Sequence, residues 1–112
     1  MTPLTPTEIE ELRIAIAREC GWTFNTQPYG DPYWAHPEIN RVFDVVPPYT
    51  TSIDAIQAAC LERFKDGIEA YEFSSSLSEL GWEPKRRYAW QLTALDWCIA
   101  FARTSKIWRY KV

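Results

Sequence analysis

The residues most readily recruited for catalysis or metal binding are one histidine and three cysteines, which lie far apart in the chain. His36 stands between an alanine and a proline in a turn-like run, and no G-x-S-x-G nucleophile elbow is present in the sequence. Cys20, Cys60 and Cys98 form no C-x-x-C pair and no Cys-His cluster, so the spacing offers no set of zinc ligands. We therefore expect a structural or surface role for His36, reduced cysteines packed in the core, and no metal or cofactor.

Carboxylates that could act in pairs lie at two places where a helix is expected to begin. They are Glu8, Glu10 and Glu11, followed by Asp66, Glu69 and Glu72. Acidic side chains stabilise the positive end of a helix, so their positions need no catalytic explanation. The four glycines are isolated from one another, whereas a loop that cradles phosphate needs several close together. These features predict no catalytic residue and favour a protein that is not an enzyme.

Charge is distributed unevenly along the chain. Residues 1–84 carry five Lys or Arg and fourteen Asp or Glu, a balance of −9, whereas residues 85–112 carry seven Lys or Arg and one Asp, a balance of +6. A basic segment of this kind is typical of a surface that binds nucleic acid, a nucleotide or an acidic partner. Alternatively, the basic segment neutralises the acidic helices of the same chain, and the net charge of −3 favours this interpretation.

Tryptophan is the second unusual feature, because the chain contains six of them in 112 residues. Trp22 and Trp82 each follow a glycine at a predicted helix end, and Trp97 falls on an apolar helical face. The remaining indole rings are candidates for a binding surface, where aromatic side chains are favoured anchors. The candidate binding residues are Trp34, Trp90, Trp108, Tyr110, Lys85, Arg86, Arg87 and Arg109. The alternative is that all six tryptophans fill one small core.

The first element that must position these residues is a helix over residues 6–20. Thr5 is predicted to be its N-cap and Glu8 its N3 residue, with a proline at N1, which together make a capping box. Apolar side chains recur at the spacing of one helical face. Gly21 is predicted to end the helix as its C′ residue, with Trp22 as C″.

The middle of the chain alternates between strand and helix signals. Residues 22–26 and 33–35 are predicted to be short strands around a turn, and residues 42–46 fit either a strand or a packed loop. A second helix is expected to begin near residues 50–52, where three hydroxyl side chains compete for the N-cap. Residues 66–80 fit both helical spacing and a period of two, and we interpret them as helix.

The last third of the chain is predicted to contain the central helix. Residues 88–104 are apolar on most sides, as is typical of a helix surrounded by others, and residues 107–112 alternate like an edge strand. The whole pattern predicts an α+β fold, with three to four helices packed with a small two- to three-stranded sheet or hairpin. We expect one compact domain over residues 1–112. No apolar run is long enough to span a membrane and no secretory signal is present, so we expect a cytoplasmic protein.

Several short motifs resemble the phage ABA sandwich domain, a family of small phage and prophage proteins. The family pattern Leu-Pro-x-Tyr, a hydroxyl or acidic residue and then Leu-Asp-Ala is similar to residues 46–55, where valine replaces the first leucine. Residues 20–22 (Cys-Gly-Trp), residues 34–37 (Trp-x-x-Pro) and the alanine-rich stretch 89–102 are also similar, although the stretch starts Ala-Trp-Gln rather than Ala-Thr-Ala. The resemblance implies a phage origin and a compact mixed fold, and the family name implies layered α/β/α packing. It implies no catalytic residue.

The function that we expect from the sequence is binding rather than catalysis. The first hypothesis is a non-enzymatic phage-type accessory protein that binds a host protein in the host cytoplasm. Inhibition of a host defence or regulatory system is the expected form of action. The alternative is nucleic-acid or nucleotide binding through the basic residues 85–112, whose tryptophan and tyrosine side chains would stack on bases.

Overall fold

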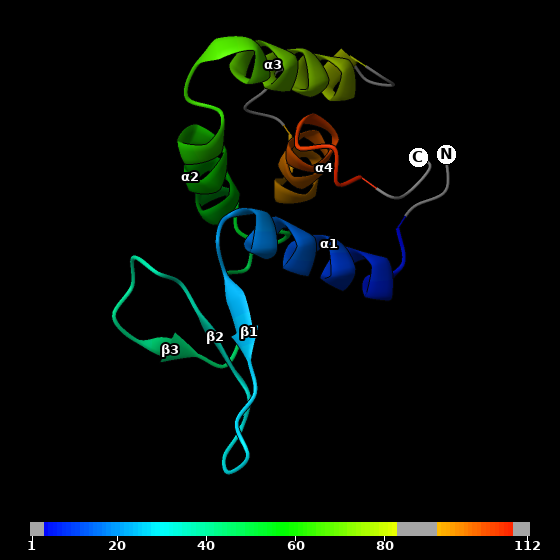
Figure 1. Cartoon of the computed structure of the whole chain (residues 1–112). Helices are drawn as coiled ribbons and strands as arrows, with labels where there is room; N and C mark the ends of the chain where they lie inside the picture. The colour runs from blue at the N-terminus through cyan, green and yellow to red at the C-terminus, as the bar shows by residue number, and fades with distance from the viewer. Residues whose placement is uncertain (1–3, 83–91, 109–112) are drawn as a thin grey trace.

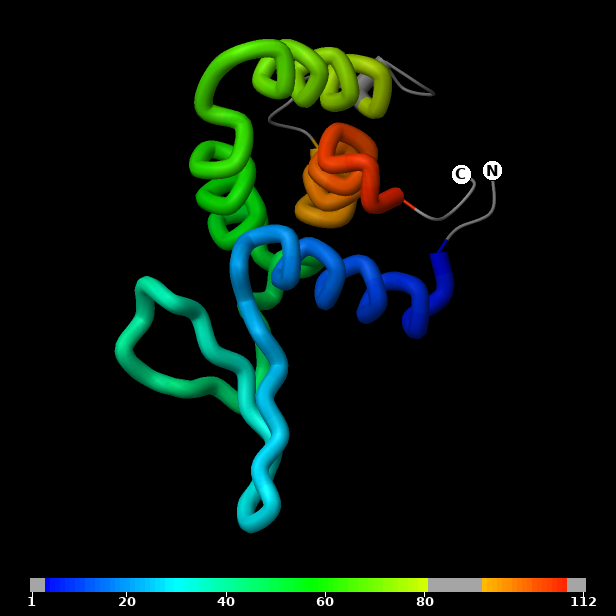
Figure 2. The backbone as a smooth tube through the Cα atoms, in the orientation of Figure 1, coloured from blue at the N-terminus to red at the C-terminus, as the bar shows by residue number. Residues whose placement is uncertain are grey.

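A computed structural model of the chain describes residues 4–82 and 92–108, in which four helices gather at one end and a small sheet projects from them (Figure 1). The α+β class and the number of helices and strands confirm the prediction. The layered α/β/α packing is not found, because the sheet extends away from the helices instead of lying between two layers of them (Figure 2). Strands of two or three residues are too short to carry a helix on each face. Among the described residues, no helix is both long and apolar enough to cross a membrane.

Helix α1 (Pro6–Glu19) begins with the predicted capping box. The Thr5 hydroxyl accepts a hydrogen bond from the Glu8 N–H at 3.1 Å, and the Glu8 carboxylate accepts one from the Thr5 N–H at 2.9 Å. The two bonds satisfy backbone N–H groups that a helix start leaves without partners. The position of this helix start is therefore fixed by side chains three residues apart.

The end of α1 also follows the prediction. Gly21 adopts a left-handed conformation with φ 101°, and its N–H donates to the Arg18 carbonyl at 3.1 Å. The Trp22 N–H donates to the Ala17 carbonyl at 3.0 Å. These two bonds form a Schellman motif, which turns the chain sharply out of the helix and into the sheet.

The sheet is formed by three short antiparallel strands in the order β1-β2-β3. Their bounds are β1 (Thr23–Asn25), β2 (Tyr33–Ala35) and β3 (Val42–Phe43). Phe24 pairs with Trp34, which in turn pairs with Phe43, so an aromatic residue of each strand lies in one row across the sheet. The first two strands confirm the prediction, and of the third predicted segment only its first two residues form a strand.

Helices α2 (Ile53–Arg63) and α3 (Gly67–Trp82) follow the sheet. Ser52 is the N-cap of α2, and its hydroxyl accepts a hydrogen bond from the Ala55 N–H at 3.3 Å. The segment 66–80, whose spacing fits both helix and strand, is helical from Gly67, as predicted, but the helix continues through Gly81, where it was expected to end, to Trp82.

Helix α4 (Ala94–Thr104) starts later than predicted. Thr93 is its N-cap, and Thr93 and Asp96 form a second capping box, so residues 92 and 93 precede the helix. Residues 88–91 of the predicted helix lie outside the described residues. Apolar residues continue at helical spacing before Thr93, so periodicity alone places the start of α4 too early. The hydrogen bonds of the capping box determine where the helix begins.

The segment after α4 differs from the predicted edge strand. Residues 107 and 108 are not in a strand, because the Ile107 N–H donates to the Ala102 carbonyl at 2.9 Å and closes the last turn of α4. Residues 109–112 lie outside the described residues. The chain therefore leaves α4 through a helix cap that involves Lys106, a residue with φ 62°.

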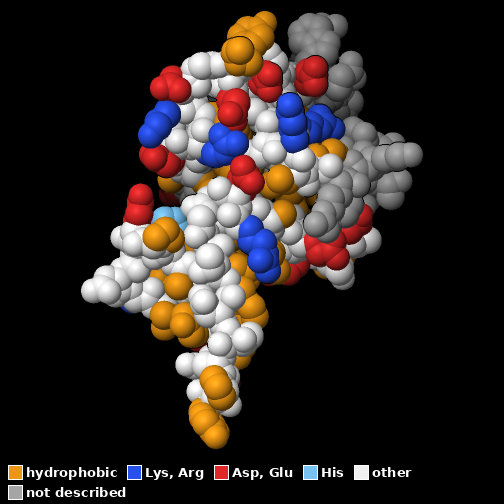
Figure 3. All heavy atoms as spheres, in the orientation of Figure 1, with side chains coloured by type: hydrophobic (Ala, Val, Ile, Leu, Met, Phe, Trp, Pro, Cys, Tyr) orange, Lys and Arg blue, Asp and Glu red, His pale blue; other side chains and the backbone are white. Residues whose placement is uncertain are grey.

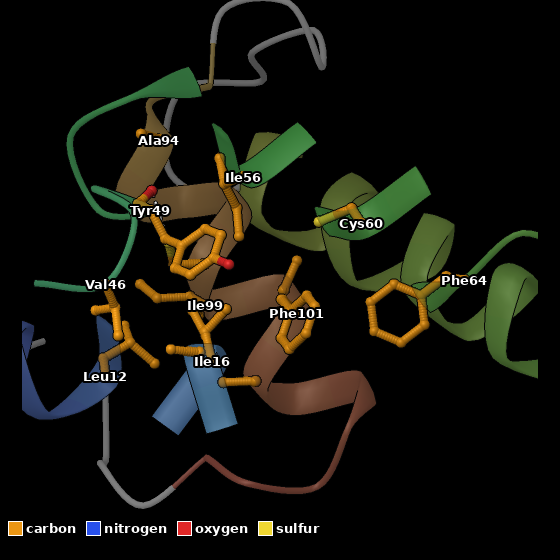
Figure 4. Close-up of a cluster of buried hydrophobic side chains, with 14 of the residues drawn as sticks. Leu12, Ile16, Val46, Tyr49, Ile56, Cys60, Phe64, Ala94, Ile99 and Phe101 are labelled. Atoms are coloured by element: carbon orange, nitrogen blue, oxygen red, sulfur yellow. Dashed lines mark hydrogen bonds between the residues drawn. The ribbon is translucent and has the colours of Figure 1, made fainter. Parts of the chain in front are cut away.

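The core lies around α4, which packs against α1, α2 and α3. Figure 4 shows its side chains meeting those of the other helices, and Phe101 is fully buried at the centre. The Phe101 ring contacts Phe64 edge to face at 5.2 Å, and Phe64 stacks on Phe73 at 4.8 Å between ring centroids. Cys60 and Cys98 are buried in this core, and all three cysteines are free thiols, as predicted.

Candidate functional site

Two of the eight candidate binding residues, Trp34 and Trp108, lie in the described part of the chain. Trp34 is only 7% exposed, and its ring packs against Phe24 at 5.0 Å and beneath the Arg18 guanidinium at 5.5 Å. Trp108 is half-buried, with the Arg103 guanidinium 5.8 Å from its ring centroid. The described residues do not include the other six candidates, which are Trp90, Tyr110, Lys85, Arg86, Arg87 and Arg109. Trp34 therefore supports the sheet from inside rather than presenting its ring to solvent.

His36 follows β2 and holds the end of α1 against the sheet. Its Nε2 lies 2.9 Å from the Cys20 carbonyl, and its Nδ1 accepts a hydrogen bond from the Glu38 N–H at 3.1 Å. Because Nδ1 accepts a hydrogen bond, Nε2 is the ring nitrogen whose N–H donates to the Cys20 carbonyl. The edge-to-face contact with Trp22 at 5.3 Å completes its surroundings. Of the two roles predicted for His36, structural or surface, these backbone contacts agree with the structural one.

Two further polar groups near His36 are held in their neutral forms. Burial raises the pKa of the Cys20 thiol above its ordinary value, so the thiolate that acts as a nucleophile is disfavoured. Burial also raises the pKa of Tyr49, whose hydroxyl accepts a hydrogen bond from the Trp22 indole N–H at 3.2 Å. These groups therefore bind one another and the backbone around the start of the sheet.

Two adjoining hollows open between the sheet and the helices, and together they are called the apolar groove. The larger, of about 560 Å³, lies between the end of α1, the loop after β2 and the alanine face of α2. The smaller, of about 350 Å³, lies along β3 and the loop that follows it. Trp22, Ile39 and Pro47 line both hollows, so the two lie side by side. The side chains lining the smaller hollow are apolar throughout.

The surface around the groove exposes more apolar residues. Val45 lines the smaller hollow and is 63% exposed, and Ile39 is 40% exposed. Phe24 and Tyr29 extend the apolar surface along the β1-β2 hairpin. Figure 3 shows apolar side chains gathered on the projecting sheet and at its tip, whereas the Lys and Arg side chains of this face lie mainly over the helices. A concentration of this kind at one end of a small protein is typical of a binding surface.

The larger hollow has a charged margin. Arg63 donates to Glu19 from Nε at 3.4 Å and from Nη2 at 3.3 Å, and its Nη1 lies 2.6 Å from Glu69. One guanidinium thus joins α1, α2 and α3 through two carboxylates. Within residues 4–82 and 92–108, no group of three or more His, Cys, Asp or Glu is placed to hold a metal ion. The groove is therefore a largely apolar surface with polar groups at one margin.

Sequence reasoning did not identify the groove. Ile39 and Val45 line it and lie between Pro37 and Pro47, where the sequence left residues 42–46 open as a strand or a packed loop. The one feature of the sequence that could have indicated the groove is the number of apolar residues in this segment, which forms little regular secondary structure. Such residues lie either in the core or on a surface that binds something.

Comparison with models of protein families, with curated proteins and with solved structures found no match for this chain. The resemblance to the phage ABA sandwich domain therefore remains a prediction that rests on short motifs. The function has to be argued from the groove and from the charges around it.

Proposed function

We propose that this chain is a non-enzymatic phage-type accessory protein that acts by binding a host protein in the apolar groove. The observation that carries the proposal is the pair of adjoining hollows, about 560 and about 350 Å³, that share Trp22, Ile39 and Pro47. Concave apolar sites of this size are suited to anchoring side chains of a partner. Inhibition of a host defence or regulatory system is the form of action we expect, because such a module acts by covering a surface of its partner.

The polar groups beside the groove support binding rather than chemistry. Both ring nitrogens of His36 are engaged by the backbone, and the Tyr49 hydroxyl is bonded to an indole. The Cys20 thiol keeps its proton because burial raises its pKa. A general base or nucleophile needs a lone pair that is free to react, and these groups are occupied in holding the sheet to the helices.

The experiment compares two valines that have similar exposure and different positions. Val45 lines the groove and is 63% exposed, whereas Val42 is 60% exposed and does not line either hollow. Immobilised wild-type protein, Val45→Glu and Val42→Glu are each incubated with host lysate, and retained proteins are quantified. Circular dichroism of each variant checks that the fold is kept.

We expect wild-type protein and Val42→Glu to retain one host protein at a stoichiometric level, and Val45→Glu to lose most of it. A carboxylate in an apolar contact is desolvated without a partner, so the binding loss should be about tenfold or more. Failure of all three to retain a stoichiometric partner would contradict the proposal. Equal retention by Val45→Glu would also contradict it, since the partner would then bind elsewhere.

A further inference from the structure

A third hollow, of about 460 Å³, lies between the end of α1 and the end of α4. Arg18 and Glu19 line it from α1, and Lys106, Ile107 and Trp108 line it from the segment after α4. Glu19 also lines the apolar groove, so this carboxylate lies at the border of the two sites. The third hollow therefore combines an aromatic ring with two cations from distant parts of the chain.

Cations at this hollow are not neutralised by carboxylates of the described residues, although Arg18 and Arg103 each contact an indole ring. Within the described ranges, 4–82 and 92–108, the cations Arg13, Arg63 and Lys65 are in ion pairs. Within the same ranges, three cations at or beside the hollow are in no ion pair. Arg18 and Lys106 line the hollow, and Arg103 contacts the ring of Trp108, which forms its aromatic wall. The one carboxylate that lines the hollow, Glu19, already binds the guanidinium of Arg63. An acidic protein thus has a local excess of positive charge here.

Lys106 is held in a conformation that costs free energy. It is the only residue other than glycine with a positive φ in the described part of the chain, at 62°. Its N–H donates to the Arg103 carbonyl at 3.2 Å, and Ile107 completes the Schellman motif. Glycine is the usual residue at this position, and strained residues persist most often where they take part in function. Lys106 is exposed and places its charge beside the hollow.

The ends of both helices would repel an anion unless their carbonyl groups were occupied. The last carbonyls of α4 accept hydrogen bonds from the N–H groups of Ser105, Lys106 and Ile107. The Arg18 carbonyl of α1 accepts a bond from Gly21 in the same way. These bonds and the nearby cations offset the negative end of each helix dipole.

We propose that this hollow binds single-stranded nucleic acid, with one base against Trp108 and neighbouring phosphates on Lys106, Arg103 and Arg18. A strand fits better than one phosphate group, because its repeating charges can reach Arg18 and Lys106, which line the hollow from different elements, and Arg103, which contacts the Trp108 ring. The Arg103 guanidinium supports the Trp108 ring, 5.8 Å from its centroid. The site combines Arg103, Lys106 and Trp108, at the end of α4 and just after it, with Arg18 of α1.

The experiment measures fluorescence anisotropy of a labelled oligothymidylate at about 50 and about 200 mM NaCl. Wild-type protein is compared with Lys106→Gly, with an Arg18→Gln/Arg103→Gln double variant, and with Lys65→Gln. Lys65 is an exposed cation at the end of α2 that pairs with Glu62, so its loss controls for net charge. Competition with unlabelled thymidine monophosphate and with duplex DNA identifies the source of the phosphate.

We expect saturable binding that weakens at the higher salt concentration, with a loss of about tenfold in the double variant and several-fold in Lys106→Gly. Lys65→Gln should stay within about twofold of wild type. Because glycine suits the left-handed position, Lys106→Gly should bind less tightly while unfolding at a higher temperature, an outcome that damage to the fold would not give.

Three results would overturn this proposal. The first is no saturable binding at the lower salt concentration. The second is an equal loss in Lys65→Gln and in the variants of the hollow, which would indicate a general charge effect. The third is competition by the mononucleotide or by duplex DNA as effective as that by the unlabelled strand, because the ligand would then be another phosphate compound.

Discussion

The ends of α1 and α4 have the same backbone hydrogen bonds and different residues at the position that requires a left-handed backbone. Gly21 occupies that position after α1, and Lys106 occupies it after α4. A Cβ atom on Gly21 would lie 3.3 Å from Nε2 of His36, so packing as well as backbone conformation requires glycine there. Lys106, by contrast, is exposed, and it lines a hollow.

The difference shows that the same motif can form with or without glycine at its left-handed position. After α1 the motif turns the chain into the sheet, and its glycine minimises strain. After α4 the motif carries a lysine, which costs more free energy than glycine in a left-handed conformation. Three measurements of the free energy of unfolding test this comparison. The first uses the thiols of Cys20 and Cys60, and the others use the two left-handed residues, Gly21 and Lys106.

The largest change in the free energy of unfolding is expected at alkaline pH, where the buried thiol of Cys60 should behave differently from that of Cys20 at the end of α1. Burial raises the pKa of Cys60 from 9.0 to about 12, whereas Cys20 is only half-buried. Between pH 9 and about pH 12, the Cys60 thiol therefore loses its proton in the unfolded chain and keeps it in the folded protein. The free energy of unfolding should therefore fall by up to about 1.4 kcal/mol per pH unit for this thiol, and be unaffected below pH 9.

Urea unfolding at several pH values would measure this slope. Cys60→Ala should flatten it by about one proton, and Cys20→Ala should flatten it less. A slope that stays unchanged in Cys60→Ala would show that its thiol does not carry the pH dependence.

A smaller loss is expected for Gly21→Ala. The alanine would be strained at φ 101° and would press on His36, so the free energy of unfolding should fall by about 2 to 3 kcal/mol. Gly67→Ala is the matched control, because Gly67 also has a positive φ, 78°, but a Cβ atom there meets nothing within 4 Å. Urea unfolding should give a loss of only about 1 kcal/mol for the control. Equal losses in the two variants would show that contact with His36 adds nothing.

The smallest effect has the opposite sign. Lys106→Gly should raise the free energy of unfolding by about 0.5 to 1 kcal/mol, because glycine adopts the left-handed conformation without strain. Lys106→Ala removes the same charge and keeps the strain, so it should give no such gain. Thermal unfolding of both variants would measure the difference. A gain in Lys106→Ala as large as in Lys106→Gly would assign the effect to charge instead of backbone strain.

Helix boundaries were predictable where side chains only a few residues apart determine them. Thr5, Glu8 and Gly21 predicted both ends of α1, and each is found in its expected role. Thr93 and Asp96 carry the same signal for α4 at the same spacing. The apolar period continues before Thr93 and masks this signal, so a capping box should outweigh periodicity at a helix start.

The candidate sites were less predictable than the helices. Trp34 was expected among the binding residues, yet its ring lies beneath Arg18 and against Phe24. Ile39 and Val45, which line the apolar groove, come from a segment whose sequence left a strand and a packed loop open as alternatives. A residue's type indicates that it prefers burial or contact, but only its neighbours in space decide which of these it achieves.

From its residues alone, the chain specified where α1 begins and ends, that Ser52 would lie near the start of α2, and that its thiols would stay unpaired. Each of these features depends on hydrogen bonds within a few residues or on cysteine spacing. Only the tertiary structure decided that Arg63 would join three helices and that Arg18 would share a hollow with Lys106. Those neighbours are far apart in the sequence, and the packing of the helices around α4 brings them together.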